Sequence, residues 1–213
     1  MTDADVVADI TEGGVIGIVR GADADVVIDV VDALVAGGVR AVEITADTDG
    51  VLGMLEDVTA SFDDVSLGAG TVLDSATARA VMLAGAEFVV TPTVDAAVIE
   101  TCNRYGAPVV PGAFTPTEAL SAVEAGADLV KVFPASTGGP DHVAALGGPL
   151  GQIPLVPTGG VDLENAGAYL DAGADALGVG SALVDGSAVG RGDFGELERR
   201  ARALRETVTS HRP

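Results

Sequence analysis

The chain has 213 residues with a formal net charge of −21, and 48 % of its side chains are hydrophobic. This apolar content supports a full core and excludes a disordered chain, while the shortage of Lys and Arg argues against nucleic acid as a partner. We favour adaptation to a salt-rich cytosol over simple solubility as the cause of the charge, because salt screens like-charge repulsion. A single cysteine, Cys102, excludes an internal disulfide and is typical of a small buried hydrophobe.

The N-terminal segment 1–14 is acidic and lacks the basic and apolar regions of a signal peptide. No uninterrupted apolar stretch approaches the ~18 residues that a membrane-spanning helix requires. We therefore expect a cytoplasmic protein with no membrane partner.

Eight short apolar segments predict buried strands. They occupy residues 15–19, 39–45, 66–71, 87–92, 107–111, 128–134, 153–160 and 176–181. Helix-like segments such as 24–38 and 115–127 lie between them, and this alternation favours a parallel sheet. Eight such units predict an α/β fold in one domain over residues 1–213, a single (β/α)8 TIM barrel. The alternative is an open doubly wound sheet, whose G-x-G-x-x-G signature is missing after the first strand.

A weak repeat marks the ends of four predicted helices. Ala-Gly pairs occur within residues 36–39, 84–87, 125–128 and 172–175, each directly before a predicted strand. Because Gly adopts positive φ without steric cost, we expect these glycines to end their helices.

Lys131 is the one lysine of the chain, and it lies inside an apolar segment. Side chains alternate along a strand, so Lys131 shares a face with Leu129 and Phe133. Val130 and Val132 take the opposite face, which suits contact with helices and turns Lys131 into the barrel. Arg would serve equally at a surface, yet only Lys forms a Schiff base, so we favour a catalytic amine over a surface residue. Catalysis then requires burial or a neighbouring cation to lower the lysine pKa.

Glu43 is a second charged residue within an apolar strand. By the same alternation, Ala41, Glu43 and Thr45 face the interior near the end of their strand. We expect Glu43 to share the barrel mouth with Lys131 and to relay protons, the alternative being a paired structural carboxylate.

Two further candidates follow predicted strands. Arg20 is suited to hold a carboxylate through two parallel N–H bonds, or to form an ordinary surface ion pair. Thr71 follows a glycine-rich segment, where its hydroxyl either binds an anion or caps the next helix.

Small residues follow the last two predicted strands, in PTGGV at 157–161 and VGSAL at 179–183. The corresponding loops of this fold often bind phosphate through backbone N–H groups, so an acidic chain needs no lysine there. The alternative is a pair of tight turns without a ligand. The two histidines and one cysteine form no ligand pattern, and no metal site is predicted.

Six segments between about residues 14 and 185 form an ordered set that is far more specific than any one of them. They are GGVRAVEIT, GAGTV, EFVVTP, DLVKVFPA, VPTGGV and GVGSALV. Together they resemble the 2-keto-3-deoxy-6-phosphogluconate aldolase family. The resemblance implies a homotrimeric (β/α)8 barrel that uses no metal or other cofactor. It also implies cleavage of 2-keto-3-deoxy-6-phosphogluconate to pyruvate and glyceraldehyde 3-phosphate, as in Entner-Doudoroff catabolism.

The resemblance also implies roles for the residues of this chain that match the family's motifs. Lys131 corresponds to the Schiff-base lysine and Glu43 to the general acid/base. The other candidates would bind substrate, at the pyruvate pocket or near the phosphate: Arg20, Thr71, Pro92, Phe133, Thr158, Gly159, Gly160, Gly180 and Ser181.

One position departs from the family pattern. Many members read T-L-R-T after the glutamate, and their Arg binds the pyruvate carboxylate, whereas residues 45–48 here place Asp47 at that position. An acidic residue cannot take this role. Other members resemble this chain in carrying an Arg just after the first strand, so we assign the carboxylate to Arg20.

We expect neutral Lys131 to form an iminium with the C2 ketone of the substrate. The iminium then accepts the electrons of the C3–C4 bond while Glu43 removes the C4 hydroxyl proton. The same chemistry on 2-keto-3-deoxy-6-phosphogalactonate or 4-hydroxy-2-oxoglutarate is an open alternative. A phosphosugar isomerase, a phosphate-binding synthase and a non-catalytic metabolite-binding protein are more distant ones, and the inward Lys and Glu argue against them.

Overall fold

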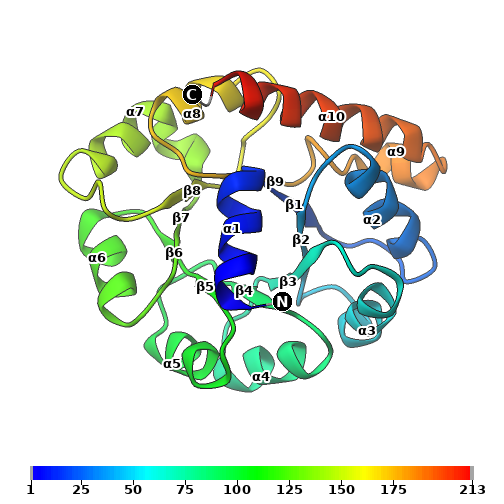
Figure 1. The fold of residues 1–213 in the computed structure, drawn as a ribbon, viewed down its shortest axis with the longest axis horizontal. Coiled ribbons are helices and arrows are strands. Elements are labelled where there is room, and N and C mark those ends of the chain that lie inside the picture. Colours follow the sequence, from blue (N-terminus) through cyan, green and yellow to red (C-terminus); the bar gives the residue numbers. More distant parts are fainter. Residues whose placement is uncertain (1, 212–213) are drawn as a thin grey trace.

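The computed structural model describes residues 2–211, in which short strands alternate with helices (Figure 1). The strands are β1 (Val15–Val19), β2 (Ala41–Thr45), β3 (Ser66–Gly70), β4 (Phe88–Val90), β5 (Val109–Val110), β6 (Gly112–Ala113), β7 (Val130–Val132), β8 (Leu155–Pro157) and β9 (Leu177–Val179). The helices are α1 (Asp3–Gly13), α2 (Val27–Ala36), α3 (Val51–Ser61), α4 (Ser75–Leu83), α5 (Ala96–Tyr105), α6 (Pro116–Glu124), α7 (Ala135–Gly147), α8 (Ala166–Asp171), α9 (Gly186–Gly190) and α10 (Phe194–Ser210).

The paired strands run parallel and form two sheets. One has the order β5-β4-β3-β2-β1-β9 and the other β6-β7-β8. Pro111 separates β5 from β6, because a proline has no N–H to donate to a ladder. At the other junction a single bridge between Thr158 and Gly178 joins β8 to β9. The predicted α/β fold with parallel strands is confirmed, whereas the ladders form two sheets in place of one continuous ring.

The alternation of side chains along β7 separates two apolar clusters. Val130 and Val132 pack in the large cluster that includes residues of the surrounding helices. Leu129 packs in a smaller cluster inside the ring of strands, together with Phe88 of β4 and Ile10 of α1. The predicted inner and outer faces of this strand are therefore confirmed.

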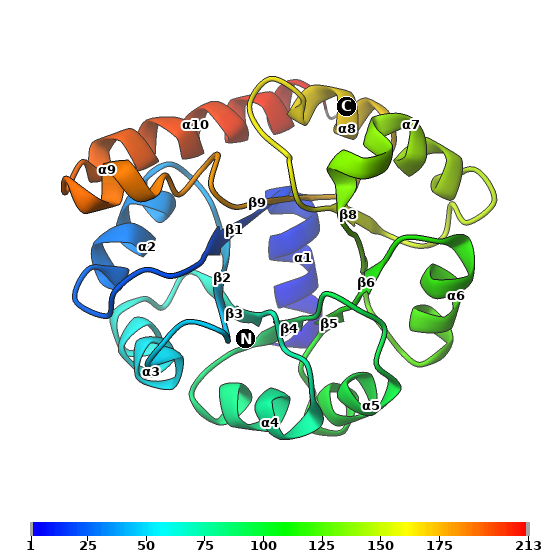
Figure 2. The same cartoon turned by 180° about the vertical axis from the view of Figure 1, so that it is seen from behind.

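Helix α1 covers the end at which the strands begin. It crosses the centre of the strands in Figure 1 and lies behind them in the opposite view of Figure 2. Ile10 belongs to one cluster with Ile16, Phe88 and Ala176, each of which lies near the start of a strand. The carboxyl ends of the strands consequently open on the opposite side, where sites of parallel α/β folds are found.

The predicted helix-ending glycines all adopt the left-handed conformation. Their φ values are 90° at Gly38, 110° at Gly85, 103° at Gly126 and 92° at Gly173. Two of them also pack closely, since a Cβ at Gly85 would lie 2.3 Å from the Thr59 hydroxyl oxygen. At Gly85 a larger residue would therefore combine backbone strain with a clash.

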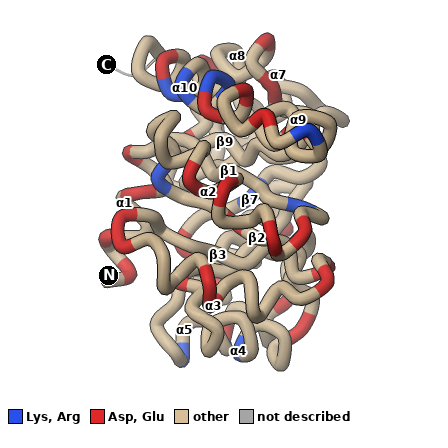
Figure 3. Tube along the Cα trace, turned by 90° about the vertical axis from the view of Figure 1, so that its right-hand side faces the viewer, with Lys and Arg blue, Asp and Glu red and all other residues tan. Residues whose placement is uncertain are grey.

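The surface carries the acidic charge. Figure 3 shows Asp and Glu spread over helices and loops, with several of the arginines on α10. Some of these arginines pair with glutamates of the same helix, as Arg199 and Arg200 do with Glu196. Within residues 2–211, no helix is both long and apolar enough to cross a membrane. Cys102 is buried in the core as predicted, and burial raises the pKa of its thiol to about 11.

Candidate active site

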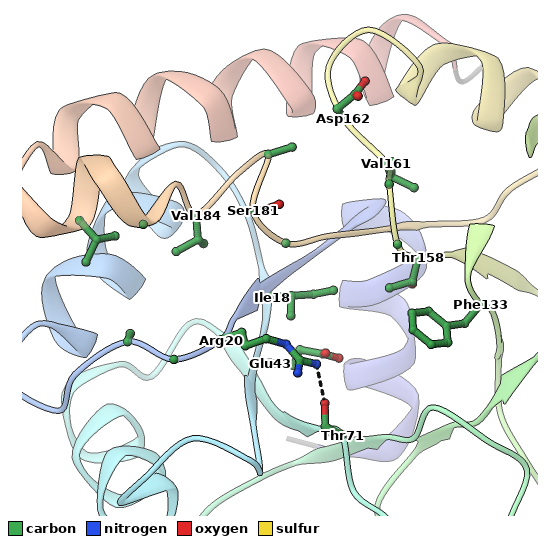
Figure 4. A pocket seen from close by; sticks show the side chains of 18 of the residues that line it. Ile18, Arg20, Glu43, Thr71, Phe133, Thr158, Val161, Asp162, Ser181 and Val184 are labelled. Atoms are coloured by element: carbon green, nitrogen blue, oxygen red, sulfur yellow. Dashed lines mark hydrogen bonds between the residues drawn. The ribbon is translucent and has the colours of Figure 1, made fainter. Parts of the chain in front are cut away.

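A cavity of about 950 Å³ opens at the carboxyl ends of the strands (Figure 4). All the residues that the sequence predicts for the site line this cavity, from strands and loops far apart in the chain. They are Arg20, Glu43, Thr71, Pro92, Lys131, Phe133, Thr158, Gly159, Gly160, Gly180 and Ser181.

Lys131 lies on β7 with only 6 % of its surface exposed. Its Nζ lies 4.8 Å from the centre of the Phe133 ring, a distance at which the aromatic face attracts a cation. Burial lowers the pKa of Lys131, the Glu43 carboxylate opposes this change, and the Arg20 charge adds to it. The site therefore favours the neutral, nucleophilic amine more than water does.

Glu43 lies on β2 and is 2 % exposed. A Cβ at Gly70 on the neighbouring strand would lie 2.3 Å from its Oε1, so only glycine leaves room for the carboxylate. Burial raises the pKa of Glu43, while the charges of Lys131 and Arg20 oppose this effect. Burial thus pushes both the acid and the amine toward their neutral forms, and their mutual attraction counteracts it.

Arg20 follows β1, and two other loops hold its guanidinium. One nitrogen donates to Asp47 Oδ2 at 2.7 Å, and the other donates to Thr71 Oγ1 at 2.8 Å. Thr71 adopts a φ of 57°, in the left-handed region that favours glycine. Figure 4 shows the bond from the Arg20 guanidinium to Thr71 as a dashed line. Asp47 does not replace the missing arginine of the family pattern, and instead pairs with Arg20.

The small-residue loops after β8 and β9 form another part of the cavity wall. Gly159 and Gly160 have φ values of 89° and 82°, and a Cβ at Gly160 would lie 2.6 Å from the Cβ of Ser136. The Asn165 side chain donates to the Gly160 carbonyl at 2.8 Å and stabilises this turn. Backbone N–H groups in such a glycine turn are suited to an anion.

The sequence did not identify two acidic residues of the cavity wall. Asp23 and Asp162 line the cavity, and Asp162 accepts bonds from the N–H groups of Glu164 and Asn165, as in a local turn. The sequence could have indicated Asp162, because it directly follows the PTGGV segment that was predicted to line the site. Among the described residues, no group of three or more His, Cys, Asp or Glu is arranged to hold a metal ion.

Comparisons with known proteins identify the family of this chain. The profile of the family "KDPG and KHG aldolase" matches residues 6–200. The 2-dehydro-3-deoxy-6-phosphogalactonate aldolase of Escherichia coli is 37 % identical over 79 % of this chain and 83 % of its own length. A structure described as native KDPGal superposes with a TM-score of 0.87 at 33 % identity, over 92 % of this chain and 95 % of the other. The KDPG aldolase of Legionella pneumophila, captured with pyruvate as a covalent carbinolamine, gives a TM-score of 0.87 at 26 % identity over 96 % and 98 %.

The family profile and the relatives of this parallel α/β fold define an enzyme of the aldolase class. Aldolases are lyases that act on carbon–carbon bonds. The chain belongs to the KDPG and KHG aldolase family.

Proposed function

We propose that this chain is a class I aldolase that binds its substrate as a Schiff base on Lys131. The observation that carries the proposal is the buried pair of Lys131 and Glu43 in one cavity. Burial lowers the pKa of the amine, which favours its nucleophilic neutral form, and raises the pKa of the carboxyl, which makes its carboxylate a stronger base. The relative captured as a carbinolamine with pyruvate supports the same covalent chemistry.

In this mechanism the Lys131 amine adds to the C2 ketone, and loss of water gives an iminium. Glu43 removes the C4 hydroxyl proton, the C3–C4 bond breaks, and its electron pair passes to the iminium to form an enamine. The aldehyde leaves, the enamine is protonated at C3, and water releases pyruvate and the free amine. Arg20 holds the C1 carboxylate, with Thr71, Pro92 and Phe133 around the pyruvate moiety.

The substrate we propose is 2-keto-3-deoxy-6-phosphogluconate, with its phosphate at the glycine turns. Thr158, Gly159 and Gly160 form one side of this subsite, and Gly180 and Ser181 the other. The galactonate epimer is a second candidate, because the Escherichia coli relative is named for it. Pyruvate release from the two phosphorylated epimers, from 4-hydroxy-2-oxoglutarate and from the unphosphorylated sugar acid ranks these substrates. Equal rates with and without phosphate would contradict the phosphate subsite.

The proposal includes the wider architecture. Only Pro111 separates β5 from β6 and a single bridge joins β8 to β9, which supports one closed (β/α)8 barrel in a single domain. We also propose a cytoplasmic homotrimer that is stable in molar salt. Light scattering measures the oligomer, and thermal unfolding in low and molar KCl measures the salt effect.

Borohydride reduction in the presence of pyruvate tests the central claim. We expect a covalent adduct on Lys131, identified by mass spectrometry of its peptide, and no adduct in Lys131→Arg. An active enzyme that borohydride with pyruvate leaves unmodified would overturn the Schiff-base mechanism.

A further inference from the structure

The loop after β2 holds the loop after β1 in place at the mouth of the cavity. Asp47 accepts a bond from the Arg20 guanidinium at 2.7 Å, and the Thr48 hydroxyl accepts one from the Gly21 N–H at 3.1 Å. Thr48 is itself anchored, with its Oγ1 3.1 Å from the Thr45 Oγ1 at the end of β2. One short loop thus fixes both a side chain and the backbone of its neighbour.

The guanidinium is held on two sides although the side chain is exposed. Side chains of Arg20 and Asp47 are 59 % and 48 % exposed, so an isolated pair of this kind would stabilise the fold little. Thr71 adds a second anchor at 2.8 Å, on the other terminal nitrogen. Among residues 2–211, Thr71 is the single non-glycine residue with a positive φ, a costly conformation that occurs often at ligand sites.

Two anchors still leave donors for a ligand. A guanidinium has five N–H groups in a fixed plane, and the bonds to Asp47 and Thr71 use two of them. A carboxylate requires two parallel N–H groups for bidentate binding. Since the plane is rigid, anchoring two corners fixes the direction in which the remaining donors point.

The held guanidinium acts on the reactive groups. The Arg20 charge lowers the pKa of both Lys131 and Glu43, so it stands within electrostatic reach of the amine and the acid. Both residues line the cavity together with Arg20.

We infer that Asp47 is a positioning residue, which orients Arg20 for the carboxylate of the keto acid through the shared guanidinium. This inference rests on the proposed function, in which Arg20 binds that carboxylate. Asp47 is not among the residues that line the cavity, so in this inference it acts through Arg20. Its negative charge is tolerated beside an anion site because Arg20 neutralises it.

The test measures how much pyruvate half-saturates borohydride trapping on the full chain. Arg20→Gln should raise this concentration about tenfold, since it removes a charge-assisted bond pair. Asp47→Ala should raise the half-saturating pyruvate concentration about three- to tenfold. Asp47→Asn retains an oxygen acceptor, so its half-saturating concentration should lie between those of Asp47→Ala and the native chain. Asp49→Ala is the matched control, because it removes the same charge from an exposed position of the same loop.

Two arms separate positioning from a general structural effect. In the Arg20→Gln background, Asp47→Ala should raise the half-saturating pyruvate concentration by less than about twofold. The effects of two substitutions are not additive when one residue acts through the other. Trapping with acetone, which has the ketone but lacks the carboxylate, should be equally efficient in Asp47→Ala and the native chain.

Each other result overturns the inference. Full additivity of the two substitutions, or an equal loss with acetone, would show that Asp47 does not act through Arg20. A lower half-saturating concentration in Asp47→Ala would show that Asp47 competes with the ligand for Arg20. If Arg20→Gln itself has no effect, both the Asp47 role and the Arg20 role fail, while trapping on Lys131 still tests the Schiff base separately.

Discussion

The two ends of the strands are built from the same alternation of side chains but carry different residue types. At the end covered by α1, the inward positions include Ile16, Phe88 and Leu129, which pack in one apolar cluster. At the carboxyl end, the inward positions include Glu43 and Lys131 beside a cavity. The difference shows that one end contributes stability and the other accepts an energetic cost for chemistry. Substitutions at the α1 end should therefore leave catalysis unchanged, and substitutions at the carboxyl end should leave the stability of the fold unchanged.

The largest expected effect lies at the carboxyl end. Lys131→Arg should reduce kcat by about 10⁴-fold or more, because the guanidinium retains charge but cannot form the iminium. The fold should persist, and Lys131→Met should unfold at the same temperature as the native chain or higher, since it replaces a buried ionisable amine by an apolar side chain. Pyruvate release and thermal unfolding measure the two properties. Substantial activity in Lys131→Arg would instead favour an isomerase or a synthase.

Glu43→Gln should lower kcat by about 10²- to 10⁴-fold with a much smaller change in KM. The amide retains the shape of the carboxylate and cannot accept the C4 hydroxyl proton. Steady-state kinetics of pyruvate release separate the two constants. An unchanged kcat would leave Glu43 a structural carboxylate, as the sequence also allowed.

At the opposite end, Ile10→Ala should lower the free energy of unfolding by about 2–5 kcal/mol, through lost burial and the cavity left behind. Ile10 is fully buried where α1 meets the inner cluster. KM should remain unchanged, because no part of α1 lines the cavity. Urea unfolding gives the stability, with Ile28→Ala, on the partly exposed side of α2, as the milder control. A loss of substrate binding without a loss of stability would contradict the division between the two ends.

The sequence predicts the carboxyl end well because its signals are local. A charged residue inside an apolar strand, such as Lys131 or Glu43, needs only the alternation of side chains to be placed inward. The four Ala-Gly pairs likewise end their helices by backbone conformation alone. The small residues after the last two strands also line the cavity.

Features that depend on contacts between loops were not predictable. The bond between Arg20 and Asp47 joins residues 27 positions apart through side chains that no periodicity places. From the sequence, Asp47 is notable only for the arginine it replaces. The predicted strand 107–111 ends at Pro111, whereas the structure continues beyond this proline with β6 (Gly112–Ala113), which pairs in the other sheet.

The smallest expected effect is a shift of the pH dependence at the carboxyl end. Burial, with help from Arg20, lowers the pKa of Lys131 below 10.5, and the Glu43 charge opposes this. Trapping with pyruvate should therefore increase with pH as the amine loses its proton, with a midpoint below pH 10.5.

In Glu43→Gln the opposing negative charge is gone, so the pKa of Lys131 should fall further and the midpoint should move to lower pH. In Arg20→Gln a repelling positive charge is gone, and the midpoint should move to higher pH. Initial trapping rates at saturating pyruvate, measured over the pH range, give both midpoints. Midpoint shifts in opposite directions for the two variants would show that the charges around Lys131 control its pKa. Shifts of both midpoints in the same direction would indicate a rearranged cavity. Ile10→Ala should leave the midpoint where it is in the native chain, because the α1 end carries no charge within reach of Lys131 in the described contacts.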